Sequence, residues 1–96
     1  FGTLADKDWA PMLDALAPLA RDRFYVAPQG GVRGAADAAA MVARHRGVPI
    51  QSTREALSRF GAGRGPSLVV VAGSIVLVGE ARSFLLGLPR DPPVAL

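Results

Sequence analysis

Residues 67–74 of this 96-residue chain read Ser-Leu-Val-Val-Val-Ala-Gly-Ser, and the expected fold follows from them. The run Ser67–Ala72 is apolar at consecutive positions instead of alternating, which is typical of a central parallel strand covered by helices on both faces. Gly73 and Ser74 follow at the carboxyl end of that strand. The next five residues, 75–79, are again apolar and fit either a strand or a buried helix.

The segments on either side alternate between strand-like and helix-like patterns. Runs of β-branched and aromatic residues indicate strands, and apolar residues three and four apart indicate helices. The expected elements are, in chain order, the end of a strand at 1–4, a helix from Trp9 to about Leu16 or Ala17, a strand at 23–27, a helix at 35–46, an edge strand at 48–51, a helix from Ser52 to about Phe60, and a final helix that includes 80–88. This order predicts an α/β domain with a mainly parallel sheet.

Local signals mark several of the helix ends. Asp8 is placed to cap the first helix, and Pro18 cannot continue it. Ser52, with Glu55 three residues later, forms a capping box, and Gly47 is a ready C-terminal cap for the helix before it. The boundaries of the expected helices rest on these five residues.

Composition excludes many kinds of site. A chain of 96 residues, half of them apolar, has room for one domain with a core. It has no cysteine and one histidine, His45, so disulfides, thiolate or histidine zinc sites and a serine triad are not expected. The longest apolar stretch, 67–79, is shorter than the ~20 residues of a membrane helix, and no signal peptide is recognisable. We expect a cytoplasmic protein with no metal and no membrane contact.

The positive charge does not point to nucleic acid. The formal net charge is +3, and ten of the eleven cationic residues are arginines scattered along the chain. Nucleic-acid interfaces cluster cations on one face, often with aromatic residues between them. We interpret the arginines as a solvated surface. A salt-sensitive nucleic-acid binder is the less favoured alternative.

Two segments are candidates for ligand binding because ligands of parallel sheets bind outside the carboxyl ends of the strands. One is Leu4–Asp8, which contains Lys7, the single lysine, and the other is Gly73-Ser74. Backbone N–H groups at a helix start, a serine hydroxyl and a lysine ammonium all donate to carboxylates. Lys7 and Ser74 would then form a carboxylate-binding pair. Spacing alone favours the simpler interpretation, in which Lys7 is a solvated lysine and Ser74 only caps a helix.

Other residue sets give weaker signals. Arg33 lies in the glycine-rich loop 30–34 and is a candidate anion contact, although a plain loop arginine explains it as well. That loop does not match GxGxxG, and no GxxxxGK[ST] phosphate loop is present. No set of side chains completes a catalytic constellation, so we expect no catalytic residue in the chain.

Several segments together resemble a known enzyme family. They are 2–8, 12–13, 16–19, 23–28, 32–35 and 71–80, which agree with the family in order and spacing. The family is folylpolyglutamate synthase/dihydrofolate synthase of the Mur ligase superfamily, and the resemblance is to its C-terminal domain. The resemblance implies a Rossmann-like sheet over residues 1–88 and a helix over Ile75–Leu86. Beyond it, the tail at 89–96 carries three prolines and should be an extended end.

The resemblance also implies a function. These enzymes use ATP to join a folate or pteroate carboxylate to the amino group of glutamate through an acyl-phosphate. By analogy with the related Mur ligases, Lys7 and Ser74, with Gly73 beside it, would bind the glutamate carboxylates. ATP and magnesium belong to an N-terminal domain of the parent enzyme, so no cofactor is expected in this chain. Its partners would be that domain, glutamate and the folate substrate.

Part of the family pattern is absent. The Asp-Gly-Ala-His-Asn-Pro-type segment and the P-loop domain would lie upstream of Phe1, so we expect a domain truncated at its N-terminal side and a chain that is inactive alone. The truncated edge should favour self-association. Two alternatives remain open: the same domain of a Mur-type peptidoglycan ligase, or a non-enzymatic α/β anion-binding or interaction module. The segment 73–80 favours the folate branch.

Overall fold

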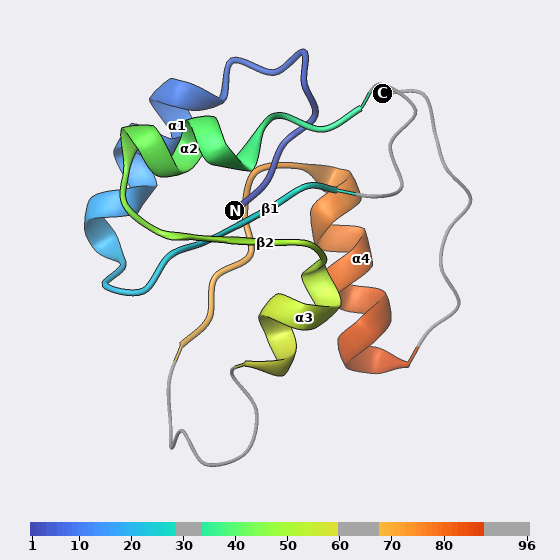
Figure 1. Cartoon of the computed structure of the whole chain (residues 1–96). Coiled ribbons are helices and arrows are strands. Elements are labelled where there is room, and N and C mark those ends of the chain that lie inside the picture. The colour runs from blue at the N-terminus through green and yellow to red at the C-terminus, as the bar shows by residue number, and fades with distance from the viewer. Residues whose placement is uncertain (29–33, 60–67, 88–96) are drawn as a thin grey trace.

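The structure, a computed structural model, describes residues 1–28, 34–59 and 68–87, and this part of the chain contains two strands and four α-helices (Figure 1). The elements are α1 (Trp9–Leu16), a single 3₁₀ turn η1 (Ala17–Leu19), β1 (Phe24–Val26), α2 (Ala38–Arg44), β2 (Val48–Ile50), α3 (Thr53–Ser58) and α4 (Ile75–Leu86). The fold is α/β, as expected, with a small parallel sheet.

The sheet is extended by backbone hydrogen bonds on one side of β1. β1 and β2 pair in parallel, with Tyr25 opposite Pro49. On the other side of β1, the nitrogen of Phe1 donates to the carbonyl of Phe24 and the N–H of Val26 donates to the carbonyl of Phe1, both at 2.9 Å. This is the hydrogen-bond pattern of a parallel ladder. Segment Phe1–Leu4 therefore lies beside β1 as a strand would.

A fourth extended segment, Leu68–Ala72, lies beyond Phe1–Leu4. The N–H of Gly2 donates to the carbonyl of Ala72 at 3.3 Å. The order across the sheet is thus β2, β1, Phe1–Leu4 and Leu68–Ala72.

Helices cover both faces of the sheet. Successive side chains of β1 point to opposite faces, so each face has its own buried cluster. Tyr25 packs with Leu13 and Met41 in one buried cluster, on the face covered by α1 and α2. Val26 packs with Leu77 in a second cluster, on the face covered by α3 and α4. Figure 1 shows the strands between these two helix pairs.

Several sequence predictions are confirmed. α1 ends at Leu16, and the 3₁₀ turn that contains Pro18 follows it. The strands at 23–27 and 48–51 are present as β1 and β2. The Ser52 hydroxyl accepts from the N–H of Glu55 at 3.1 Å and caps α3. The stretch with ambiguous periodicity is helical, because α4 spans Ile75–Leu86.

The helix expected at 35–46 is shorter than predicted. Ala35 bridges Leu4 in antiparallel fashion, and the Asp37 carboxylate accepts from the N–H of Ala39, so α2 begins only at Ala38. It ends at Arg44 because His45 is already extended. Gly47 is therefore not its cap.

Gly47 has a packing role instead. A Cβ at this position would lie 2.8 Å from the carbonyl oxygen of Arg23 and would press into the Tyr25 ring. Glycine lets the start of β2 pass directly against β1.

The prediction of a central, doubly covered strand at 67–72 is wrong for the residues described. Leu68–Ala72 is extended but not a regular strand, and Leu68 and Val70 are 90% and 68% exposed. The apolar composition predicts burial, but burial requires neighbours on both sides. Among the described residues only Phe1–Leu4 lies beside this segment in the sheet. Residues 30–33 of the glycine-rich loop and the expected tail at 89–96 lie outside the described residues.

No helix in the described ranges has both the length and the apolar character needed to cross a membrane.

Candidate functional site

The backbone preceding α4 passes directly against Phe1–Leu4. Gly73 has φ of +122°, a conformation that side-chain-bearing residues rarely adopt, and a Cβ there would collide with the carbonyl of Gly2. A Cβ on Gly2 would in turn collide with the carbonyl of Val26. The two glycines therefore allow the backbone of Phe1–Leu4 to contact both the end of β1 and the end of Leu68–Ala72.

Ser74 is the N-cap of α4. Its hydroxyl oxygen accepts from the N–H of Leu77 at 3.0 Å, which confirms the capping role that the sequence allowed. This bond uses a lone pair of the oxygen and leaves the hydroxyl hydrogen to donate elsewhere. The first N–H groups of α4 also lack helical acceptors, and the helix dipole adds partial positive charge. The half-buried Ser74 can thus cap the helix and donate to an anion at once.

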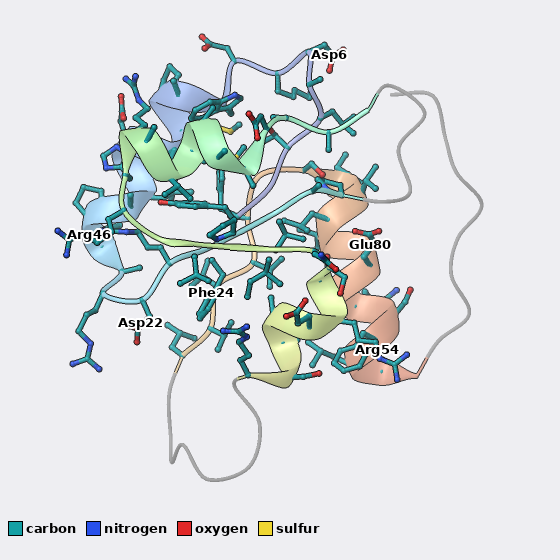
Figure 2. All side chains as sticks on the ribbon, in the orientation of Figure 1. Asp6, Asp22, Phe24, Arg46, Arg54 and Glu80 are labelled. Carbon is teal, nitrogen blue, oxygen red and sulfur yellow. The ribbon has the colours of Figure 1, made fainter. Side chains whose placement is uncertain are left out.

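Lys7 lies in an exposed turn after Phe1–Leu4, in which its N–H donates to the carbonyl of Leu4 at 3.2 Å. Figure 2 shows the neighbouring Asp6 at the outer tip of this loop. No hydrogen bond or ion pair joins the Lys7 side chain to any described residue. The structure therefore leaves the ammonium available but does not bring it into contact with Ser74.

Asp8 and Arg33 were the other candidates named from the sequence. Asp8 is the N-cap residue of α1, as predicted, but its side chain makes no capping hydrogen bond. Arg33 lies outside the described residues. No group of three metal-ligating side chains gathers within the described ranges.

Thr3 is a polar residue of this region that the sequence analysis missed. Its side chain is fully buried, and its hydroxyl is the one buried side-chain polar atom without a partner among the described residues. An unpaired buried hydroxyl costs about 1–3 kcal/mol. A threonine inside a strand-like segment is common, so the sequence carried no signal for this burial.

Arg23 was also missed, and its role is structural. Its guanidinium donates to the carbonyls of Arg46 and Ala17, both at 2.7 Å. It thereby joins η1 to the turn before β2. Only the fold brings these carbonyls together, because they lie far from each other in the chain.

A separate polar cluster joins α1 to α2. The Arg44 guanidinium holds both oxygens of Asp14, at 2.7 and 2.6 Å, and His45 Nε2 lies 2.7 Å from Oδ1. The hydrogen bond from Arg44, followed by that from His45, holds the pKa of Asp14 well below its ordinary value of 3.8. The carboxylate is satisfied within the protein, so we assign the cluster to stability.

The pKa of Asp14 predicts how Asp14→Asn changes stability with pH. A depressed pKa means that the ionised carboxylate stabilises the fold above pH ~4 and that this contribution is lost as pH falls toward the folded-state pKa. Asp14→Asn should lower the melting temperature at pH 7, and the difference from the original chain should shrink below pH 4. Asp22→Asn, at an exposed carboxylate 4.0 Å from Arg21, serves as control. A difference that does not change with pH would contradict the assignment.

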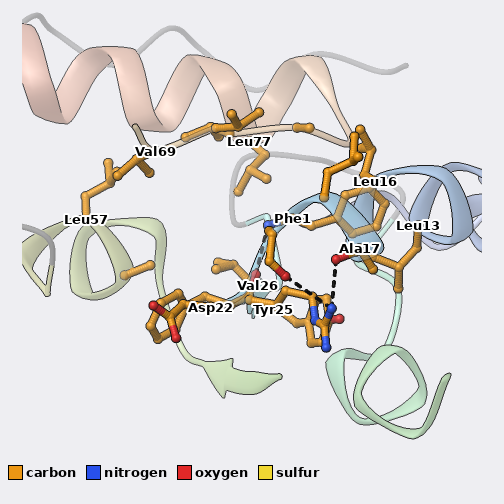
Figure 3. A pocket seen from close by; sticks show the side chains of 18 of the residues that line it. Phe1, Leu13, Leu16, Ala17, Asp22, Tyr25, Val26, Leu57, Val69 and Leu77 are labelled. Carbon is orange, nitrogen blue, oxygen red and sulfur yellow. Dashed lines mark hydrogen bonds between the residues drawn. The ribbon is translucent and has the colours of Figure 1, made fainter. Parts of the chain in front are cut away.

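A cavity among the described residues lies elsewhere. It has a volume of about 780 Å³ and is lined mainly by apolar side chains, including Phe1, Leu16, Leu57, Val69 and Leu77 (Figure 3). We call this cavity the slot. Lys7, Gly73 and Ser74 do not line it. The candidate anion site, at the ends of Phe1–Leu4 and Leu68–Ala72, is thus separate from the slot.

Comparisons with protein families, with curated proteins and with solved structures found no match for this chain.

Proposed function

We propose that this chain is the C-terminal, glutamate-positioning part of an ATP-dependent folylpolyglutamate/dihydrofolate synthase. Such an enzyme forms an amide between a folate or pteroate carboxylate and the amino group of glutamate. The proposal is supported by the sequence resemblance described above. The single structural observation that carries it is the meeting of Gly2 and Gly73 at the start of α4.

The order of the sheet supports a Rossmann-like domain. In chain order, Phe1–Leu4 is the first extended segment, β1 the second, β2 the third and Leu68–Ala72 the fourth. Across the sheet they lie in the order 3-2-1-4. This is the strand order of doubly wound nucleotide-binding folds, in which ligands bind where the order reverses. Here that point lies between the first and fourth segments, where Gly2 contacts Gly73. Ser74 follows it directly.

The chemistry of this position suits glutamate. The Ser74 hydroxyl and the first N–H groups of α4 can donate to one carboxylate of glutamate. Lys7, which lies in the neighbouring loop, can pair with a carboxylate of glutamate as well. These groups would hold glutamate so that its amine faces the activated carboxylate, which contributes orientation and not proton transfer. ATP chemistry would be supplied by another domain of the parent. The 96 residues contain no phosphate loop, so the chain alone should not turn over ATP.

Titration of the ¹⁵N-labelled chain with L-glutamate tests this proposal. We expect millimolar binding, with NMR shift changes at the amides of Gly73–Leu77 and in the Lys7 loop. Ser74→Asp should abolish them, because aspartate retains the helix cap but repels a carboxylate. Ser52→Asp, the same change at the N-cap of α3, should bind glutamate as before.

Two results would reject the glutamate site. One is an unchanged affinity of the Ser74→Asp variant. The other is that inorganic phosphate or L-alanine causes the same NMR shift changes as glutamate. Equal shifts with phosphate would favour the general anion-binding module, and equal shifts with L-alanine would indicate a site that does not select glutamate.

A further inference from the structure

The slot interrupts the sheet directly before Phe1. One of its edges is formed by Asp22–Phe24, which lead into β1, and the opposite edge by Leu68–Val71. The same two segments continue on either side of Phe1–Leu4, because Phe1 pairs with β1 and Gly2 with Ala72. The slot is therefore the prolongation of Phe1–Leu4 within the sheet.

Both faces of the slot are apolar. Leu13, Leu16 and Ala17 close one face, and Ala56 and Leu77 close the other. Figure 3 shows Phe1 among the side chains that line the cavity, with Leu13 to one side of it and Leu57 to the other. Apolar cover on both faces is the environment of a central parallel strand.

The Phe1 nitrogen marks where an occupant must end. It donates to the carbonyl of Phe24 at 2.9 Å, as the amide of a parallel strand would. Burial lowers the pKa of this ammonium, because a charged group is poorly solvated there. A neutral peptide N–H would make the same hydrogen bond without that cost.

We propose that the slot accepts an extended apolar strand of about four residues, parallel to β1 and joined to the nitrogen of Phe1. The length follows from the edge Leu68–Val71, which spans ~13 Å at ~3.3 Å per residue. That the strand belongs to the same polypeptide rests on the proposed function, in which the chain is part of a longer enzyme.

A second copy of the chain fits the slot less well. Phe1 closes one end, so a strand from the interior of another molecule could not pass through and continue. Two copies, each with a net charge of +3, would also repel one another. A strand in the slot would form one continuous strand with Phe1–Leu4. It would also bury the side of Leu68–Val71 that faces the slot.

Extension of the chain tests the proposal. Adding Val-Ile-Val-Val before Phe1 should raise the melting temperature by roughly 5–15 °C, because burial of apolar area exceeds the cost of ordering four residues. Adding Ser-Asn-Ser-Asn at the same place should leave it nearly unchanged. Equal effects of the two extensions would overturn the proposal.

Wall variants locate the added strand. Val69→Asp, on a half-exposed residue that lines the slot, should remove most of the gain from the apolar extension. Leu85→Asp, on the exposed side of α4 away from the slot, should retain it. If Val69→Asp does not fold, Leu57→Asn makes the same test from another wall. A gain that all these variants retain would place the extension elsewhere and overturn the proposal.

Two further measurements separate the competing explanations. A dimer in sedimentation that persists after the apolar extension would indicate a second copy in the slot and would reject our proposal. The gain in melting temperature does not require glutamate. An extended chain that is stabilised but does not bind glutamate would therefore reject the proposed function and leave the slot assignment intact.

Discussion

Replacing Gly73 by alanine is expected to lower the free energy of unfolding by roughly 3 kcal/mol. Two effects add at this position. The φ of +122° is strained for any residue with a Cβ, and that Cβ would collide with the backbone of Gly2, which cannot move aside as a flexible side chain can. At roughly 4–8 °C per kcal/mol for a domain of this size, the melting temperature should fall by more than 10 °C.

Gly79→Ala is the matched control for this change. Gly79 lies inside α4, and a Cβ there would meet nothing within 4 Å. Alanine is the better helix former, so this variant should gain about 0.5–1 kcal/mol. Urea unfolding of the three proteins measures both differences. A Gly73→Ala protein as stable as the original chain would show that Ala72–Ser74 does not pass against Gly2 as described.

Local chemistry predicted the end of α1 and the start of α3. Pro18 stops α1 within one turn, and Ser52 caps α3 with the hydrogen bond that its spacing to Glu55 indicates. These signals depend on neighbours in the chain, so one sequence suffices to read them. The start of α2 shows the limit. Ala35 favours a helix by composition, but pairing with Leu4 keeps it extended.

The segment Leu68–Ala72 was misjudged for a related reason. Its consecutive apolar residues resemble those of a buried central strand, yet Leu68 is 90% exposed. Apolar composition reports what a segment prefers, whereas burial depends on which other segments lie beside it. The slot next to Leu68–Val71 is the position at which such a neighbour is absent among the described residues.

The candidate site was predicted in part. The rule that ligands bind beyond strand ends led to Gly73 and Ser74, and the structure confirms a capped helix start there, although Leu68–Ala72 is not a regular strand. The same rule led to Lys7, whose turn does follow Phe1–Leu4, but the structure does not bring its side chain to Ser74. The buried hydroxyl of Thr3 could not be predicted, because its burial depends on the packing of distant segments.

Leu77→Ala is expected to cost about 2–5 kcal/mol, the usual range for a leucine removed from a core. Leu77 is 1% exposed and packs with Val26, Ile50 and Ala56, so it attaches α4 to the sheet. Alanine has the higher helix propensity, and the loss must therefore come from packing and not from the helix itself. Since Leu77 also lines the slot, its truncation enlarges a cavity that is already present.

Val78→Ala separates this packing effect from a general effect of mutating α4. Val78 follows Leu77 directly but is 44% exposed, so its truncation should change stability by less than about 0.5 kcal/mol. Urea unfolding compares the two variants, and hydrogen exchange at the Leu77 amide reports whether Ser74 still caps the helix. If packing of Leu77 holds α4 in place, Leu77→Ala should speed this exchange and Val78→Ala should not. Equal stability of the two variants would mean that α4 is attached elsewhere, and the position of Ser74 would then not depend on the sheet.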